Sequence, residues 1–477
     1  MRRNFIFLSV LCLFVQAASA QTKNWTLREC VEYALEKNIQ VRQTALEVDL
    51  AQISKNDAFG NFLPQLNGQA NHSWNIGLNQ NITTGLLENQ TTQFTSAGFN
   101  ASVDIYGGLR NQIQLRRSNL AILAANYQLD RMKDDIALNV ANAFVQILFN
   151  KENLKVQQEQ RTNNERQLER TQELVAAGSV PRADLLDMEA TLASSNLAVV
   201  QAENQLLLSK LSLAQLLQLQ DFKNFDIAPT DAEASPSSVM LEDPEKIVAR
   251  AKEVRSEIKL AEANRSVAEQ DVALARAAYQ PTLQGYYSFS TRAAYADRIM
   301  GFAPDLENPF SPIGVVQGTD QAVLQPNFVP VLGRHAPIFD QFSDNKGHNF
   351  GLQLTIPILN GFSVRNNVAQ NKVALERSKI ALEQTELDVE RNVYQALWDA
   401  RGAFESYQSA QTVAAARALS YEYAKEKYEV GMINAFDFNQ VQTLHVNAQS
   451  DVARAKYDYI FKVKVVEFYF GIPINQL

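Results

Sequence analysis

Residues 109–177 read LRNQIQLRRSNLAILAANYQLDRMKDDIALNVANAFVQILFNKENLKVQQEQRTNNERQLERTQELVAA. This stretch contains neither proline nor glycine, and it is rich in alanine, leucine, glutamine, glutamate and arginine, which favour helices. About 65 helical residues would extend roughly 100 Å. A compact domain cannot bury a helix of that length, so the stretch predicts a coiled coil, a bundle or a tube.

A second stretch of the same kind lies in the other half of the chain, at residues 363–430. Each long stretch ends near a glycine that is followed six residues later by an aspartate. The first such pair is Gly178 and Asp184, and the second is Gly431 and Asp437. The matching pairs indicate that two long helices end in similar turns and continue into further helices.

The features around these stretches recur in the same order, which is typical of an internal repeat. Segments 38–64 and 255–281 have equal length, and each is helical in pattern and ends in a proline. We therefore predict two repeats, each with a helix, a strand, a loop, a strand and a long helical hairpin. The expected parts are a signal peptide at 1–20, the first repeat at 21–220, a linker at 221–244 and the second repeat at 245–477.

Four short segments alternate between apolar and polar residues. In each, one face is apolar and the other carries mainly uncharged amides and hydroxyls. A tilted strand of similar length can cross a bilayer. A soluble sandwich with one solvated face shows the same alternation, so periodicity alone leaves both readings open. The predicted strands are about 65–76, 94–106, 282–291 and 348–357.

The number of strands restricts how they could cross a membrane. The smallest membrane barrels have about eight strands, and an open sheet in lipid would leave backbone groups unpaired. If these four strands span a membrane, several chains must share one barrel. The sequence thus demands an oligomer, but it does not by itself give the number of chains.

The first residues are typical of an export signal, with Arg2 and Arg3 before an apolar run at 5–15 and small residues at 18–20. We expect the mature chain to begin at Gln21. It contains no run of about 18 apolar residues, so we expect no membrane-spanning helix. Cys30 is the only cysteine expected after cleavage, and a small buried apolar role is the simplest reading for it.

Composition and motifs argue against several classes of function. Charged residues make up 20% of the chain, with mixed signs and a formal net charge of −8, so no nucleic-acid partner is expected. The four histidines have no metal-ligand spacing, and no nucleophile elbow, phosphate loop or dinucleotide fingerprint is present. We expect no enzymatic activity, no cofactor and no metal site.

The ordered set of features resembles the TolC family of outer-membrane efflux proteins. The N-terminal segment WTLRECVEYALEKN, residues 25–38, is similar to the opening signature of that family, and the ending at 471–473 also agrees. The paired halves, the strand pairs and the two glycine–aspartate turns extend the resemblance over the whole mature chain. No single motif is very specific, whereas their order is.

The resemblance implies a mainly α fold with a membrane β-barrel in a homotrimer. Four strands per chain would form a shared twelve-stranded antiparallel barrel in outer-membrane lipid, continuous with an α-helical barrel of long coiled helices. The protein would lie in the cell outer membrane with a long periplasmic extension. It would serve as the exit duct for an inner-membrane pump that acts through a periplasmic adaptor, a membrane fusion protein.

The resemblance also assigns a periplasmic gate. Asp437 matches the first of two aspartates that ring the closed entrance, but the second falls on Gln440, so the constriction would be less acidic. Tyr428 and Asp184 match a tyrosine and an aspartate that are hydrogen bonded in the closed state. The arginine that helps to hold the gate falls on Ile433, so that contact would be replaced.

Simpler interpretations remain for these positions. Gly178 and Gly431 would form the hairpin-tip turns where the adaptor docks, yet both also suit turns that need unusual backbone angles. Asp184 and Asp437 would also be favourable simply at a helix start. The long segment 292–346 could plug the channel, recognise a surface or have no role. For the whole chain, the alternative is an exported coiled-coil structural or adhesive surface protein.

Overall fold

The structure is a computed structural model that describes residues 24–81, 83, 85–220, 225–228 and 238–472. The predicted signal peptide and parts of the predicted linker lie outside the described residues. The chain divides into two compact units. The helical unit contains the described residues up to 53, together with 118–269 and those from 373 onward, and the strand unit contains residues 54–117 and 270–372.

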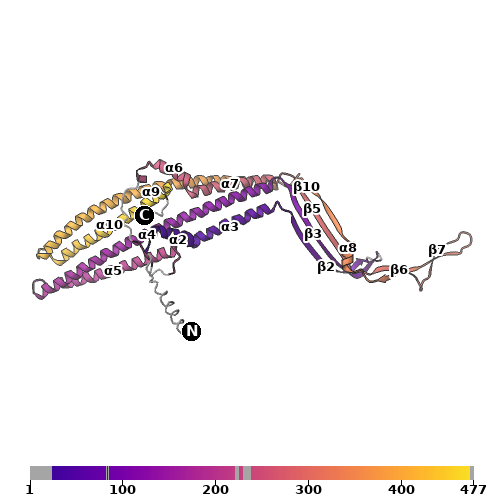
Figure 1. Ribbon diagram of the computed structural model, residues 1–477, viewed down its shortest axis with the longest axis horizontal. Coiled ribbons are helices and arrows are strands. Elements are labelled where there is room, and N and C mark those ends of the chain that lie inside the picture. The colour runs from indigo at the N-terminus through magenta and orange to yellow at the C-terminus, as the bar shows by residue number, and fades with distance from the viewer. Residues whose placement is uncertain (1–23, 82, 84, 221–224, 229–237, 473–477) are drawn as a thin grey trace, which may run out of the picture. The chain divides into compact units, whose positions relative to one another are not determined.

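Long helices dominate the described chain (Figure 1). Both predicted long helices are present, and α4 and α9 span 67 residues each. No helix in the described ranges is both long and apolar enough to cross a membrane. The helices are α2 (Leu27–Lys37), α3 (Ile39–Gly60), α4 (Arg110–Ala176), α5 (Arg182–Leu216), η1 (Ser238–Leu241), α6 (Pro244–Val254), α7 (Ser256–Ala277), α8 (Ile338–Asp344), α9 (Ser363–Glu429) and α10 (Ala435–Phe470).

Strands occur at all four predicted places and at several others. The structure assigns β1 (Asn24–Trp25), β2 (Gln65–Gln80), β3 (Leu87–Gly107), β4 (Asp226–Ile227), β5 (Thr282–Ala294), β6 (Arg298–Pro304), β7 (Phe310–Val315), β8 (Ala322–Pro326), β9 (Phe328–Gly333) and β10 (Gly347–Thr355).

The helices of the two halves follow the same order and have similar lengths. α2 and α6 have 11 residues each, and α3 and α7 have 22 each. The long helices α4 and α9 are followed by α5 with 35 residues and α10 with 36.

Local chemistry explains why α2 begins where it does. The side chain of Thr26 accepts a hydrogen bond from the backbone N–H of Glu29, and the carboxylate of Glu29 accepts one from the N–H of Thr26. This reciprocal capping box satisfies donors that a helix start leaves unpaired. Cys30 is fully buried in the cluster formed with α4 and α5, in agreement with its expected role as a small apolar residue.

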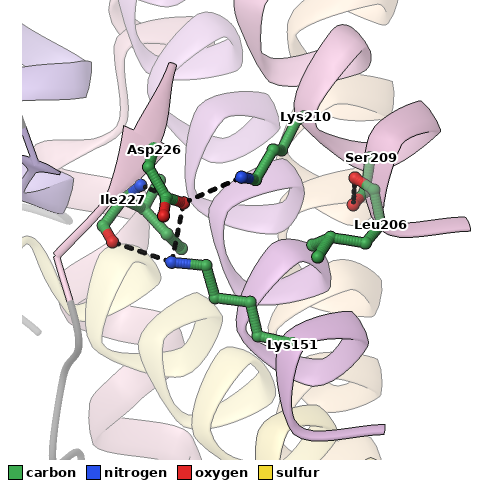
Figure 2. Close-up of polar contacts among 6 residues, drawn as sticks. All are labelled: Lys151, Leu206, Ser209, Lys210, Asp226 and Ile227. Atoms are coloured by element: carbon green, nitrogen blue, oxygen red, sulfur yellow. Dashed lines mark hydrogen bonds and ion pairs between the residues drawn. The ribbon is translucent and has the colours of Figure 1, made fainter. Parts of the chain in front are cut away.

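The short strand β4 lies within the predicted linker and is attached to the helices by polar contacts (Figure 2). β4 pairs in parallel with β1. The carboxylate of Asp226 lies 2.7 Å from the Nζ of Lys151 on α4 and 3.2 Å from that of Lys210 on α5. Lys151 also donates to the carbonyl oxygen of Ile227 at 3.0 Å. This linker clip, Lys151, Lys210 and Asp226, holds β4 against both helices of one hairpin.

The strand unit is built around a four-stranded antiparallel sheet in the order β10-β5-β3-β2. The register places Phe99 opposite both Gly68 and Phe289, and Phe350 opposite Tyr287. Opposite residues share a face of a sheet, so the apolar faces predicted separately for the four strands coincide. Phe99 and Phe289 stack with their ring centroids 5.3 Å apart.

The other face of the sheet is polar. Ser288 donates to the side-chain oxygen of Asn100 at 2.6 Å, and Gln284 donates to Asp104 at 3.2 Å. Strands β2 and β10 form the two outer edges, and neither pairs with a further strand among the described residues. The sheet therefore combines one apolar face, one polar face and two unpaired edges.

Two segments differ from the sequence expectation. The sequence predicts mainly loop for residues 76–93, but most of them extend the β2–β3 hairpin. Threonine and glutamine in this segment tolerate a strand when the neighbouring strand supplies backbone partners. The sequence also predicts a loop for the segment 292–346, yet it contains β6 to β9 and α8. Its many prolines hid these strands, because proline weakens a strand assignment.

Candidate functional site at the hairpin tips

The predicted site residues all lie in the helical unit, at the ends of two long hairpins. α4 and α5 form one hairpin, and α9 and α10 form the other (Figure 1). Gly178 follows α4 and Gly431 follows α9. The structure thus places both glycines at hairpin tips, as the sequence predicts.

The two tips are built in the same way. After α4, the N–H of Ser179 donates to Leu174 at 2.9 Å and that of Gly178 donates to Val175 at 3.0 Å. After α9, Met432 donates to Lys427 at 2.8 Å and Gly431 donates to Tyr428 at 3.1 Å. This double pattern is a Schellman motif, which satisfies the last carbonyl groups of a helix.

Both tip glycines adopt the left-handed conformation that this motif requires. The φ angles are 73° at Gly178 and 75° at Gly431. A Cβ atom added at either position would meet no other atom within 4 Å. The requirement for glycine therefore comes from the backbone conformation and not from a crowded neighbourhood.

The two aspartates lie in the first turns of the helices that follow, Asp184 on α5 and Asp437 on α10. Neither is the N-cap residue itself. The N-cap of α10 is Asn434, whose side chain accepts a hydrogen bond of 2.8 Å from the N–H of Asp437. Negative charge is favourable at this end of a helix. Asp437 and Gln440 are both exposed, three positions apart on α10, so they share one side of the helix.

Tyr428 lies at the junction of three helices. Its ring stacks on Phe438 of α10 with centroids 4.8 Å apart and an angle of 12° between the planes. Its hydroxyl lies 3.4 Å from the Oγ1 of Thr171 on α4. Among the described residues, no hydrogen bond joins Tyr428 to Asp184. The structure therefore brings Tyr428 to the first hairpin through Thr171, and the pairing with Asp184 stays a prediction.

A buried polar seam connects the two hairpins farther from the tips. Gln442 on α10 donates to the Oδ1 of Asn164 on α4 at 2.9 Å, and Asn164 donates to Ser195 on α5 at 2.5 Å. Asn439 on α10 donates to Thr191 on α5 at 3.0 Å. Asn164 and Gln442 are each only 1% exposed. We call these five residues the tip seam.

Sequence reasoning missed the tip seam, because amide side chains in a helix normally indicate a solvated face. A weak signal was available. Gln442 stands between Phe438 and Val446 at a spacing of four residues, and both neighbours are buried. An amide in an apolar helical stripe indicates a buried polar contact that must find a partner.

Two further contacts surround the seam. An exposed ion pair joins Arg170 on α4 to Glu429 on α9 at 3.5 Å. The imidazole of His445 stacks on Tyr421 with centroids 5.1 Å apart and nearly parallel planes. Burial lowers the pKa of His445, and the nearby carboxylate of Glu422 opposes that change.

Ile433 lies in the tip turn after α9, where the resemblance placed an arginine.

Comparisons with known proteins agree on one kind of molecule. The sequence matches the family described as outer membrane efflux protein over residues 30–218 and 247–463. It is 23% identical over 463 residues to the outer membrane protein TolC of Vibrio cholerae, covering 95% of this chain and 93% of that protein. It is 25% identical over 398 residues to the cation efflux system protein CusC of Escherichia coli O6:H1, covering 76% and 82%. A crystal structure of CusC superimposes with a TM-score of 0.74 at 18% identity and covers 94% of this chain and 92% of its own.

Proposed function

Because the chain belongs to the outer membrane efflux protein family, we propose that it forms the outer-membrane exit duct of a tripartite efflux or secretion system. The duct conducts substrates passively from an inner-membrane pump and a periplasmic adaptor to the outside, without chemistry of its own. The observation that carries the proposal is the four-stranded sheet, with its apolar face, its polar face and its two unpaired edges. A coiled-coil surface protein does not require such a sheet, whereas a shared barrel does, so the channel is favoured.

The assembly follows from the edges of the sheet. In lipid, the unpaired backbone groups of β2 and β10 would be very costly, and four strands are too few to close a barrel. In the proposed homotrimer, three chains contribute four strands each to one twelve-stranded antiparallel barrel, and the long helices form an α-helical barrel in the periplasm. The matching helix lengths of the two halves support the proposed duplication.

The hairpin tips supply the proposed gate. Asp437, Gln440, Asp184 and Tyr428 lie at or near the periplasmic constriction, and the turns at Gly178 and Gly431 receive the adaptor. Opening requires the two hairpins of each chain to move apart at their ends. The tip seam and the contact of Tyr428 with Thr171 oppose this movement, so they stabilise the closed state.

The proposal can be tested with single-channel recording of detergent-purified protein in a planar bilayer, with the oligomeric mass measured on the same preparation. We expect a detergent-dependent trimer with small, stable currents. A variant that lacks the buried amide of Gln442 should conduct more. The matched control is Gln449→Leu, which makes the same change at an exposed position on α10.

The outcomes separate the two classes of function. A conducting trimer supports the exit duct, and larger currents after loss of the seam support the gate. An oligomer that needs no detergent and does not conduct would overturn the channel and favour the coiled-coil surface protein.

A further inference from the structure

The two helices that adjoin the edge strands of the sheet each carry an exposed apolar stripe. Helix α3 leads into β2, and α9 follows β10. On each helix, three large apolar residues recur at intervals of seven and are at least half exposed. A seven-residue apolar repeat is typical of helices that pack along one another in a coiled coil. The α3 stripe is Ile39, Leu46 and Ile53, and the α9 stripe is Val373, Ile380 and Leu387.

Each stripe lies on the opposite side of its helix from the residues that the helix buries within the chain. Val41 and Ala58 on α3 are buried, as are Val389 and Val393 on α9. At about 100° per residue, these positions face away from the stripes. A helix with apolar residues on two opposite sides packs between two partners. The single chain supplies one of these partners, so a second one is required.

The helices that adjoin the inner strands lack such a stripe. Helix α4 follows β3, and α7 leads into β5. Along α7, all of which the structure describes, no large apolar side chain is exposed, and along α4 the one such side chain is Leu123 at 41%. Of these four helices, the two with exposed apolar repeats are therefore the two that continue from an unpaired edge of the sheet.

We propose that the α3 stripe of one copy of this chain packs antiparallel against the α9 stripe of the next copy. Helix α3 ends where one edge strand begins, and α9 begins where the other edge strand ends. Sheets joined edge to edge therefore bring the two helices together in opposite directions. A second copy offers each stripe a partner of equal length and spacing, and one repeated contact covers both stripes. The inference rests on the proposed function for the shared sheet, and it adds the helix contact and its register.

The equal length of the stripes defines that register. A shift by one heptad, which is about 10.5 Å, would leave one residue of each stripe without a partner. A shift in either direction would also place Arg42 level with an arginine, Arg377 or Arg391. Full overlap is therefore preferred. It sets Ile53 opposite Val373, Leu46 opposite Ile380 and Ile39 opposite Leu387.

Charged residues beside the stripes are complementary in this register. Arg42 comes within one residue of the level of Glu383 on one side of the contact, and Glu47 comes within two residues of the level of Arg377 on the other side. All four are exposed, and in the described part of the chain none of them takes part in an ion pair. Flanking charges select the partner and the orientation of helices in coiled coils. The charges thus favour a second copy over an unrelated helix.

One like-charged contact accompanies these pairs. Asp49 on α3 and Glu376 on α9 come to nearly the same level, on the side of Arg42. Glu376 pairs with Lys379 at 3.2 Å within its own chain. A positive charge therefore lies beside Asp49 as well, and the flanking charges as a whole remain attractive.

Disulfide formation in the detergent-purified, full-length protein, with copper phenanthroline as the oxidant, tests the contact. The matched pairs combine Leu46→Cys with Ile380→Cys and Ile53→Cys with Val373→Cys. The mismatched pairs exchange the partners, so every thiol occurs in both kinds of pair. Mismatched thiols would lie about 10.5 Å apart along the helices, whereas a disulfide needs Cβ atoms about 4 Å apart. Cys30 is fully buried and should not interfere. We expect the matched pairs to form covalent dimers and trimers at least about tenfold faster than the mismatched pairs.

Charge reversal tests the register by a second route. Arg42→Glu and Glu383→Arg should each lower the temperature at which the oligomer dissociates, and the double variant should recover most of that loss, because residues in contact are coupled. Additive losses in the double variant would overturn the proposed register.

Channel conductance and oligomeric mass, measured for every variant, report separately on the proposed function. A conducting trimer in which matched and mismatched pairs react equally slowly would overturn the helix contact and leave the exit duct intact. A protein that neither forms a trimer nor conducts would overturn both. Covalent dimers of the single variant Leu46→Cys would show that α3 meets α3, and the proposal would then be wrong. The two matched pairs use different positions, so misfolding of one variant still leaves a decisive result.

Discussion

The side-chain amide of Gln442 on α10 donates a hydrogen bond of 2.9 Å to the Oδ1 of Asn164 on α4, and both residues are almost fully buried. Asn164 extends this bond to Ser195 on α5, so three helices of two hairpins share one polar contact. The ion pair between Arg170 and Glu429 also joins the hairpins, but it is exposed, and exposed pairs contribute little. Of these polar contacts between the hairpins, the buried amides therefore contribute more than the exposed ion pair.

Gln442→Leu should loosen this attachment. The change removes a buried hydrogen bond that is worth about 1 kcal/mol, which shifts a two-state equilibrium about fivefold. Because each of the three chains in the proposed trimer loses one such bond, we expect the open probability in planar bilayers to rise by at least that factor, while Gln449→Leu leaves it unchanged. Equal conductance of the two variants would show that the tip seam does not contribute to gating.

Tyr428→Phe should raise leakage by less than Tyr428→Ala, because phenylalanine keeps the stacking on Phe438 and loses only the hydroxyl. A double-mutant cycle identifies the partner of that hydroxyl. We expect coupling of about 0.5–1 kcal/mol between Tyr428→Phe and Thr171→Val, since residues in contact are generally coupled. Coupling to Asp184→Asn in place of Thr171→Val would instead support the hydrogen bond that the family resemblance implies.

The helices and the main strands were readable from the sequence because their signals are local and long. A stretch of 67 residues without proline or glycine has few alternatives to a helix, and the start of α2 is set by Thr26 and Glu29 alone. The turn glycines were equally clear. The alternation of the four strands predicted their apolar faces, and the register then brings those faces together.

Features that depend on distant partners were not readable. Asn164 and Gln442 are 278 positions apart, and nothing near either residue shows that the other will satisfy it. The linker clip could not be predicted for the same reason, because the two lysines that pair with Asp226 lie on different helices. The partner of Tyr428 likewise depends on how α4 meets α9. Sequence patterns place side chains on a face of an element, whereas pairing across elements requires the fold.

Gly431→Ala should lower the stability of the second tip by about 1–2 kcal/mol, because alanine disfavours the left-handed conformation. Gly431→Asn should cost less, since asparagine tolerates that conformation better. Gly402→Ala is the matched control, because Gly402 lies inside α9 with open space around it and alanine should stabilise the helix there. Thermal loss of helical circular dichroism measures all three. Equal melting of the two alanine variants would contradict the conformational argument.

Asp226→Asn should destabilise the helical unit by about 1 kcal/mol or less, because the ion pairs of Asp226 with Lys151 and Lys210 are partly exposed. Burial alone would raise the pKa of Asp226, but hydrogen bonds from Lys151, the backbone N–H of Ile227 and Lys210 hold the pKa below its usual range. The stabilisation is therefore complete above about pH 4, the ordinary pKa of aspartate, and is lost as the pH falls through the folded-state pKa.

Melting curves over a range of pH test whether the stabilisation by Asp226 is lost in acid. The difference between wild type and Asp226→Asn should be constant near neutral pH and should shrink only in acid. Asp458→Asn, which removes an exposed pair with Lys462, serves as the control and should have little effect at any pH. A difference that grows in acid would show that the clip does not depend on the ionised carboxylate.

Gln440→Asp tests how acidic the proposed constriction is. In the proposed trimer, wild type carries three carboxylates at this level, one Asp437 from each chain, and the variant would carry six. Closely spaced like charges bind divalent cations more strongly, so we expect block of the channel by a divalent cation at about tenfold lower concentration. Gln449→Asp adds the same charge farther along α10 and should leave the block unchanged. If Gln440→Asp and Gln449→Asp alter the block equally, these positions do not line a common constriction, and the gate must be formed by other residues.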